Sequence, residues 1–244
     1  MKRFFCPKEN IIADAITIDD KEEIRHIVSV MRSRVGESVN VFDGQDCEYY
    51  GVITKITKNT VTISIDRKDK SFSKKVYVTL ACAIPKKSKF DQIVERCTEL
   101  GVDKIIPIIT KRTIVNLDAR RRSAKLERWR RIAVSACKQC GRNTLIEIEG
   151  VKDFSDCLQD LKDYDAALIL CLAGKRKSLK DALRNFKGKR IIVFIGPEGD
   201  FTDDEIAQAK QAGCHLSGLG ETVLRVETAA LFVASVLKYT FESH

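Results

Sequence analysis

From residue 76 onward the chain alternates between short apolar runs and amphipathic segments, and this alternation limits the possible folds more than any other feature. The continuous apolar runs at residues 167–172 and 190–195 are typical of strands that are buried on both faces. Further strands are predicted at residues 76–84, 104–109 and 215–219, and helices at 88–100, 126–140, 202–212 and 227–239. Strands that alternate with helices predict an α/β domain whose parallel sheet is covered by helices.

The first part of the chain has a different pattern. Apolar and polar residues alternate at 39–42, 49–54 and 60–65, with turn signals between these runs. This period of two predicts a small β-barrel or sandwich, and a short helix fits residues 24–31. Residues 66–75 are polar and rich in charge, which predicts a linker. We therefore expect two domains, at residues 1–71 and 72–244.

The positive charge of the chain is concentrated in one segment. Residues 111–142 contain eleven Lys or Arg and two acids, which equals the net charge of +9 of the whole chain. Leu126, Trp129 and Ala133 recur there at helical spacing, so a basic amphipathic helix is expected. Clustered Lys and Arg favour a polyanionic partner, with nucleic acid the leading candidate. A solvated basic face without a partner is the alternative.

The cysteines and the apolar runs bear on the cellular compartment. Nine scattered cysteines do not resemble the paired framework of a small secreted domain. Cys137 and Cys140 are the only close pair; we expect both on the apolar face of a helix and predict no metal site. The longest apolar run, 166–173, is too short to span a bilayer, and the N-terminus turns polar before a signal-peptide core could form. These features predict a cytoplasmic protein that is not associated with a membrane.

Two loops of the second domain indicate a ligand-binding site. Residues 195–201 (IGPEGDF) join a buried strand to a helix that Thr202 and Glu205 should cap. Residues 219–229 (LGETVLRVETA) join the last strand to the terminal helix. Both loops should lie at the carboxyl edge of the parallel sheet, where ligands bind in such folds. Their glycine spacing indicates neither a dinucleotide nor a nucleoside triphosphate, and a simple tight turn is the alternative for the first loop.

These two loops resemble the motifs of a known family. Residues 195–205 resemble the GPEGGFS-x-x-E motif of the bacterial 16S ribosomal RNA uridine-N3 methyltransferases, the ribosomal RNA small subunit methyltransferase E family. Residues 219–229 resemble its LG-x-RILR-x-ETA motif. Similarity continues at residues 26–32, 41–44, 99–102, 105–107, 125–129 and 139–142. Two positions depart from the motifs: Asp200 replaces a glycine, and Thr222 replaces an arginine.

The resemblance implies a fold and a reaction. Residues 1–71 would form a PUA-like β-barrel that binds RNA, and residues 72–244 a SPOUT-type, trefoil-knotted methyltransferase domain. A homodimer would use S-adenosyl-L-methionine to methylate N3 of a uridine in 16S rRNA, within the small ribosomal subunit. A non-catalytic ribosome assembly factor is the alternative that explains the basic segment. A small-molecule α/β enzyme would explain the loops but not the localised charge.

The chemistry of the reaction suggests roles for individual residues. The N3 atom of uridine must lose a proton before it attacks, which spreads negative charge onto O2 and O4. Arg225 is the first candidate to stabilise that charge and Arg112 the second, while Glu198 or Glu227 could accept the proton. Alternatively, Arg225 is a structural contact to loop carbonyls or to Glu227.

Two further sets of residues are predicted to bind ligands. The cofactor is expected to contact Leu172, Ile195, Gly196, Glu198, Gly199, Leu219, Gly220, Val223 and Leu224. The RNA is expected to contact Arg112, Arg121, Arg122, Lys125, Arg128 and Arg142.

Overall fold

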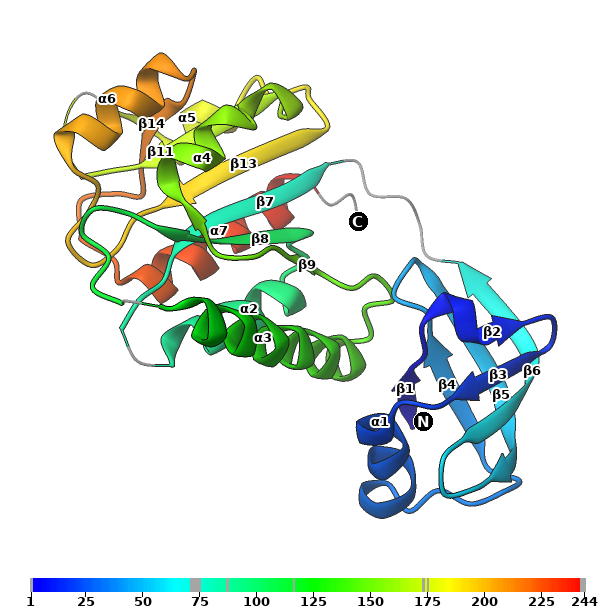
Figure 1. The fold of residues 1–244 in the computed structure, drawn as a ribbon. Helices are drawn as coiled ribbons and strands as arrows, with labels where there is room; N and C mark the ends of the chain where they lie inside the picture. Colours follow the sequence, from blue (N-terminus) through cyan, green and yellow to red (C-terminus); the bar gives the residue numbers. More distant parts are fainter. Residues whose placement is uncertain are drawn as a thin grey trace. The chain divides into compact units, whose positions relative to one another are not determined.

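A computed structural model describes residues 2–70, 76–86, 88–115, 117–172, 174 and 176–241 (Figure 1). The chain divides into two compact units. The first contains residues 1–73 and 134–145, and the second contains residues 74–133 and 146–244. The predicted boundary between residues 71 and 72 lies outside the described residues, so the domain limits stay a prediction.

The first unit is built on one mixed sheet. Its strands follow the order β1-β4-β5-β6-β3-β2, in which β1 and β4 are parallel and the other neighbours antiparallel. They are β1 (Arg3–Phe5), β2 (Ile11–Ile12), β3 (Ala15–Ile18), β4 (Ser38–Phe42), β5 (Cys47–Ile56) and β6 (Val61–Lys70). The helical segments are η1 (Lys8–Asn10), α1 (Lys21–Arg25) and the π-helical η2 (His26–Val30). The small β domain with a helical segment near residues 24–31 is therefore confirmed.

The predicted linker is partly wrong, because residues 66–70 continue strand β6. Residues 67–70 pair with residues 47–50 of β5. Their charged side chains are exposed, and the guanidinium of Arg67 lies 4.1 Å from the ring centre of Tyr50 and also pairs with Asp69. Pairing with β5 satisfies the backbone hydrogen-bonding groups of the strand, while its charged side chains remain exposed to solvent. The remaining linker residues, 71–75, lie outside the described residues.

The second unit contains the predicted parallel sheet. Every pair of neighbouring strands is parallel, in the order β10-β8-β7-β13-β11-β14-β12, and β9 also pairs with β8. These strands are β7 (Tyr77–Ala83), β8 (Lys104–Ile109), β9 (Glu147–Ile148), β10 (Lys152–Asp153), β11 (Ala166–Leu170), β12 (Lys177–Ser178), β13 (Arg190–Ile195) and β14 (His215–Gly218). This confirms the α/β class.

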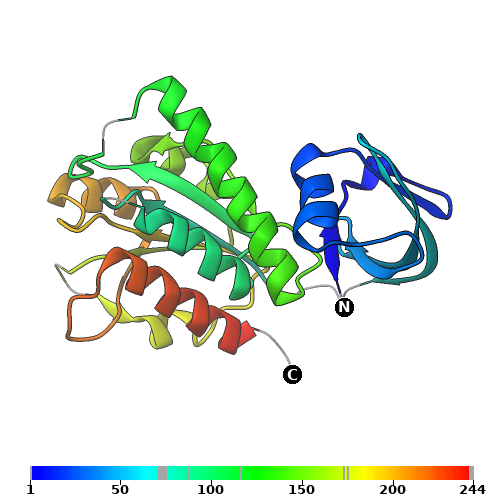
Figure 2. The ribbon, with the colours of Figure 1, turned by 90° about the horizontal axis from the view of Figure 1, so that it is seen from below.

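Helices cover both faces of this sheet (Figures 1 and 2). Side chains of α2 (Lys89–Glu99), α3 (Ala119–Cys140), α5 (Leu179–Leu183) and α7 (Val226–Phe241) share one core. Those of α4 (Phe154–Gln159), η3 (Leu161–Asp163) and α6 (Asp203–Gln211) share the other. Leu80 and Cys82 of β7 face the first core and Ala81 the second, as the period of a strand requires. None of the described helices is long and apolar enough to cross a membrane.

Pro107 lies within β8, and the strand is nevertheless continuous. On one side, Pro107 lies opposite Cys82 of β7. On the other side, β9 pairs with residues 104–105 and β10 with residues 108–109. Neither ladder reaches Pro107, so the missing N–H of proline falls in the gap between two short partner strands.

Candidate functional site

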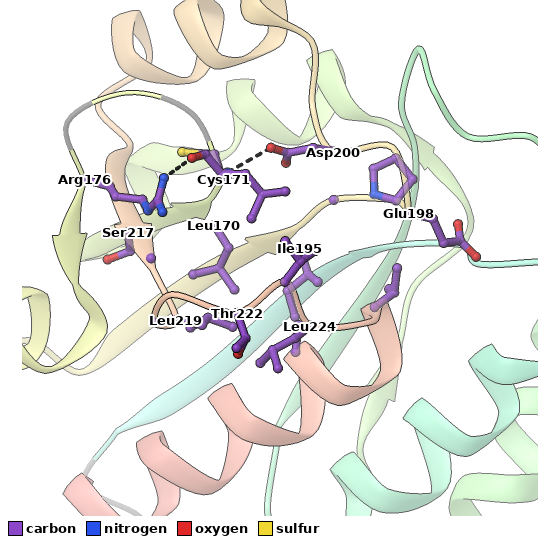
Figure 3. A pocket seen from close by; sticks show the side chains of 18 residues that line it. Leu170, Cys171, Arg176, Ile195, Glu198, Asp200, Ser217, Leu219, Thr222 and Leu224 are labelled. Atoms are coloured by element: carbon purple, nitrogen blue, oxygen red, sulfur yellow. Dashed lines mark hydrogen bonds between the residues drawn. The ribbon is translucent and has the colours of Figure 1, made fainter.

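A pocket opens at the carboxyl edge of the parallel sheet (Figure 3). It is lined by residues at the ends of β11, β13 and β14, by the loops that follow, and by the first turn of α7. The two loops singled out in the sequence therefore meet at one edge. Their strands are not neighbours, however, because β11 lies between β13 and β14 and contributes residues 170–172.

Most of the residues predicted to bind the cofactor line this pocket. They are Leu172, Ile195, Gly196, Glu198, Leu219, Gly220, Val223 and Leu224. Gly199 is not among the lining residues, and a Cβ atom there would lie 3.4 Å from Cδ of Arg112. Of the residues with predicted catalytic roles, Glu198 lines the pocket, whereas Arg225 and Glu227 do not.

Other lining residues were missed in the sequence. They are Leu170, Cys171, Arg176, Pro197, Asp200, Ser217, Gly218, Thr222, Val226 and Ala229. The apolar strand at residues 167–172 was a usable signal, because its carboxyl end must reach the same edge as the other strands. Arg176 belongs to no recognisable motif. Asp200 and Thr222 were noted only as departures from the family motifs.

Asp200 ties two of the loops together. Its φ of 61° is left-handed, a conformation that glycine adopts freely and that aspartate tolerates better than most residues. One carboxylate oxygen accepts from Leu172 N and the other from Phe201 N, both at 2.9 Å. The backbone N–H of Asp200 donates to Pro197 O at 3.0 Å, so the loop does contain a tight turn, and this turn lies in the pocket wall. The predicted capping box of Thr202 and Glu205 then begins α6.

The second loop leads into α7. Gly220 has a φ of 121°, which side-chain-bearing residues rarely adopt, and it lets the chain turn out of β14. Leu219, Leu224 and Val226 supply apolar walls to the pocket. Arg225 immediately precedes α7, its side chain is exposed, and its carbonyl accepts from Ala229 N at 2.8 Å.

The two candidate bases differ in their surroundings. Glu227 forms an ion pair with Lys89, with 2.8 Å between Oε1 and Nζ. Burial would raise the pKa of Glu227, but the hydrogen bond and charge of Lys89, the backbone and Arg225 together hold this pKa below its usual value. Glu198 is exposed at the pocket rim and accepts a 3.3 Å hydrogen bond from the backbone N–H of Lys86. A general base should have a pKa near the operating pH, so the ion pair makes Glu227 the weaker candidate.

Arg112, the second candidate cation, holds a loop in place. Its Nη1 donates to the carbonyl oxygens of Gly199 at 2.6 Å and Phe201 at 3.3 Å. The side chain thus connects the segment after β8 to the loop after β13. Because carbonyl groups already engage this guanidinium, Arg225 is the better candidate for contact with a substrate.

Four of the predicted RNA contacts lie on α3. Arg121 is exposed, and Arg128 is exposed with its Nη2 2.8 Å from Asp91 Oδ2. Arg122 donates to Leu117 O at 3.0 Å, and Lys125 Nζ lies 5.8 Å from the ring centre of Trp129. The buried Trp129 also donates to Asp91, which fixes the basic helix to α2. Arg142 is half-buried and belongs to the first unit.

The cysteine pair is not as predicted. Cys137 is buried, but Cys140 is exposed, so the expectation that both face the apolar side is wrong. Cys140 is the last residue of α3, where no further helical turn covers it. Among the described residues no group of three or more His, Cys, Asp or Glu is arranged to hold a metal ion.

Comparisons with known proteins agree with this architecture. Residues 73–238 match the model of the RNA methyltransferase domain, and residues 18–66 match that of the RNA methyltransferase PUA domain. The Bacillus subtilis ribosomal RNA small subunit methyltransferase E is 30% identical over 91% of this chain and 89% of its own length. The Synechocystis enzyme of the same name is 27% identical over 99% of this chain and 78% of its own length.

A solved structure is also similar. The crystal structure of a ribosomal RNA small subunit methyltransferase E from Neisseria gonorrhoeae, bound to S-adenosyl methionine, superimposes with a TM-score of 0.86 at 28% identity. The similarity covers 99% of this chain and 98% of that one. With the matched domains, this confirms the predicted fold class, a PUA-like domain joined to a SPOUT-type methyltransferase domain.

Proposed function

Because the chain belongs to the ribosomal RNA small subunit methyltransferase E family, we propose that it transfers a methyl group from S-adenosylmethionine to N3 of a uridine in 16S rRNA. The pocket at the carboxyl edge of the parallel sheet is the single observation that carries the proposal. The expected substrate is the small ribosomal subunit, and the expected compartment is the cytoplasm, where subunits mature.

The pocket suits this cofactor. Leu170, Ile195 and Leu224 give it apolar walls, as an adenosine requires. Ser217 lines it with a fully buried hydroxyl that has no hydrogen-bond partner within the described part of the chain. Such a group is costly unless a ligand satisfies it. The residues that we expect to hold the cofactor are the predicted ones that line the pocket: Leu172, Ile195, Gly196, Glu198, Leu219, Gly220, Val223 and Leu224. Gly199 was predicted with them but does not line the pocket.

The side chains around the pocket can prepare the uridine for attack. When bound, S-adenosylmethionine supplies an electrophilic methyl group on a sulfonium. Glu198, exposed at the rim, would accept the N3 proton directly or through water. Arg225 would stabilise the charge that this deprotonation places on O2 and O4. Arg121, Arg122, Lys125 and Arg128 would contact phosphates, with Arg112 and Arg142 as further contacts.

Methylation of ribosomal subunits tests the proposal. We expect the protein to transfer labelled methyl from S-adenosylmethionine to small subunits that lack the modification, at one uridine of 16S rRNA. Mass spectrometry of nuclease digests would identify the methylated atom, and subunits that already carry the modification serve as the control. Subunit binding without methyl transfer would instead favour the non-catalytic assembly factor.

We also propose that the enzyme is a homodimer. Exposed apolar side chains lie on α7, with Phe232 44% and Tyr239 85% exposed, and Val223 is 71% exposed in the loop before α7. A second copy of the chain is the partner that would cover them. Light scattering at micromolar concentration should give twice the monomer mass, and Phe232→Asp should shift the protein toward the monomer. A monomeric wild-type protein would contradict this proposal.

A further inference from the structure

The pocket contains two opposite charges that bind the same residue. Among its lining residues, Arg176, Glu198 and Asp200 are charged. Nη1 of Arg176 donates to the carbonyl oxygen of Leu172, while Oδ2 of Asp200 accepts from its N–H at 2.9 Å. In Figure 3, Arg176 and Asp200 accordingly lie on either side of Cys171, the residue before Leu172. The end of β11 therefore carries a guanidinium on one side and a carboxylate on the other.

A glycine makes the position of Arg176 possible. A Cβ atom at Gly218 would lie 2.6 Å from Nε and 2.8 Å from Cδ of Arg176. Without that atom the guanidinium can lie against the end of β14. Ser217, the residue before Gly218, adds the buried hydroxyl described above. Arg176 and the unsatisfied hydroxyl of Ser217 both line the pocket.

Both charged groups keep capacity for a ligand. A guanidinium has five N–H donors, and the hydrogen bond to Leu172 uses one of them. A carboxylate offers about four lone pairs, and Leu172 N and Phe201 N take two of them at Asp200. The hydrogen bonds to the backbone fix both groups in place without exhausting them. A fixed pair of this kind is suited to a ligand whose own opposite charges are close together.

We infer that Arg176 and Asp200 are specificity-determining residues that bind the zwitterionic amino-acid end of the cofactor. Arg176 binds the α-carboxylate, Asp200 binds the α-ammonium, and Ser217 adds a hydrogen bond. The two ligand charges sit on one carbon atom, and the two protein groups that would bind them are both anchored to Leu172. The apolar walls formed by Leu170 and Ile195 are left for the nucleoside. This inference rests on the proposed function.

Two ligands that lack the sulfonium charge allow the contribution of the amino-acid end to binding to be measured separately. S-adenosylhomocysteine and 5′-methylthioadenosine share the adenosine thioether, but only the former carries the ammonium and carboxylate. We expect Arg176→Ala to weaken S-adenosylhomocysteine binding by about 10- to 100-fold in calorimetry, as loss of a hydrogen bond between charged groups does. The affinity for 5′-methylthioadenosine should change less than about twofold.

Conservative variants test whether the charge or only the shape of Asp200 and Arg176 matters for ligand affinity. Asp200→Asn removes the charge and keeps one oxygen for Leu172 N, while its amide nitrogen replaces the oxygen that accepts from Phe201 N. It should weaken S-adenosylhomocysteine binding by about 10-fold and 5′-methylthioadenosine binding much less. Arg176→Lys should restore part of the lost affinity. Arg184→Ala is the matched control, because Arg184 is 68% exposed, pairs with Asp181 and does not line the pocket.

The outcomes are distinguishable. Equal weakening of both ligands would show that Arg176 and Asp200 only shape the pocket, and unchanged affinity for both would show that they do not contact the ligand; either result overturns the inference. A wild-type protein that binds neither S-adenosylhomocysteine nor S-adenosylmethionine would contradict the proposed function itself. Thermal melting of each variant checks that an affinity loss does not come from unfolding.

Discussion

Replacing Arg225 with alanine is expected to lower methyl-transfer turnover by about 100-fold or more, the usual effect of removing a donor that stabilises developing negative charge. The side chain is exposed just before α7, in the loop that lines the pocket, and makes no hydrogen bond to a carbonyl of the described residues, unlike Arg112. Single-turnover rates on small ribosomal subunits at saturating cofactor would measure the effect.

Three controls define the role of Arg225. Arg225→Lys should recover only part of the rate, because a point charge does not reproduce a planar guanidinium. Cofactor affinity by calorimetry and dimer mass should change little in Arg225→Ala. Arg184→Ala, which removes an exposed arginine away from the pocket, should methylate normally. Normal turnover in Arg225→Ala would refute the catalytic role, and loss of cofactor binding or of folding would make Arg225 structural.

The combined alanine variant of Arg121, Arg122, Lys125 and Arg128 is expected to lose most of its affinity for RNA at low salt. Each phosphate contact contributes about one unit to the slope of log affinity against log salt, so the combined variant should flatten that slope by about four units. Titrations at several salt concentrations would measure it, and single variants should each account for about one unit. Cofactor affinity should not change.

A charge-matched variant tests whether position or net charge matters. Lys162, Lys180, Arg184 and Lys187 are exposed elsewhere on the second unit, and replacing all four with alanine removes the same charge. If α3 contacts phosphates, this control should keep most of the salt slope. Equal losses in the two variants, or no loss in either, would leave the basic helix as a solvated surface.

The fold class and the location of the site could be predicted from the sequence alone. Continuous apolar runs such as residues 191–195 are stable only when both faces of the strand are buried, so they predict a parallel sheet without any tertiary information. Glycine-rich loops after such strands, and the capping box of Thr202 and Glu205, are also local signals. The resemblance to two family motifs then predicted the reaction.

The side chains that join the two loops in the pocket could not be predicted from the sequence. Strand order is set by long-range pairing, and it placed β11 between β13 and β14, which brought Leu170 and Cys171 to the pocket. The same packing brought the carboxylate of Asp200 to the backbone N–H of Leu172. It also placed the side chain of Arg176 where any residue larger than Gly218 would have its Cβ atom. Local sequence cannot encode such contacts, because they join segments far apart in the chain that meet only when the sheet has formed.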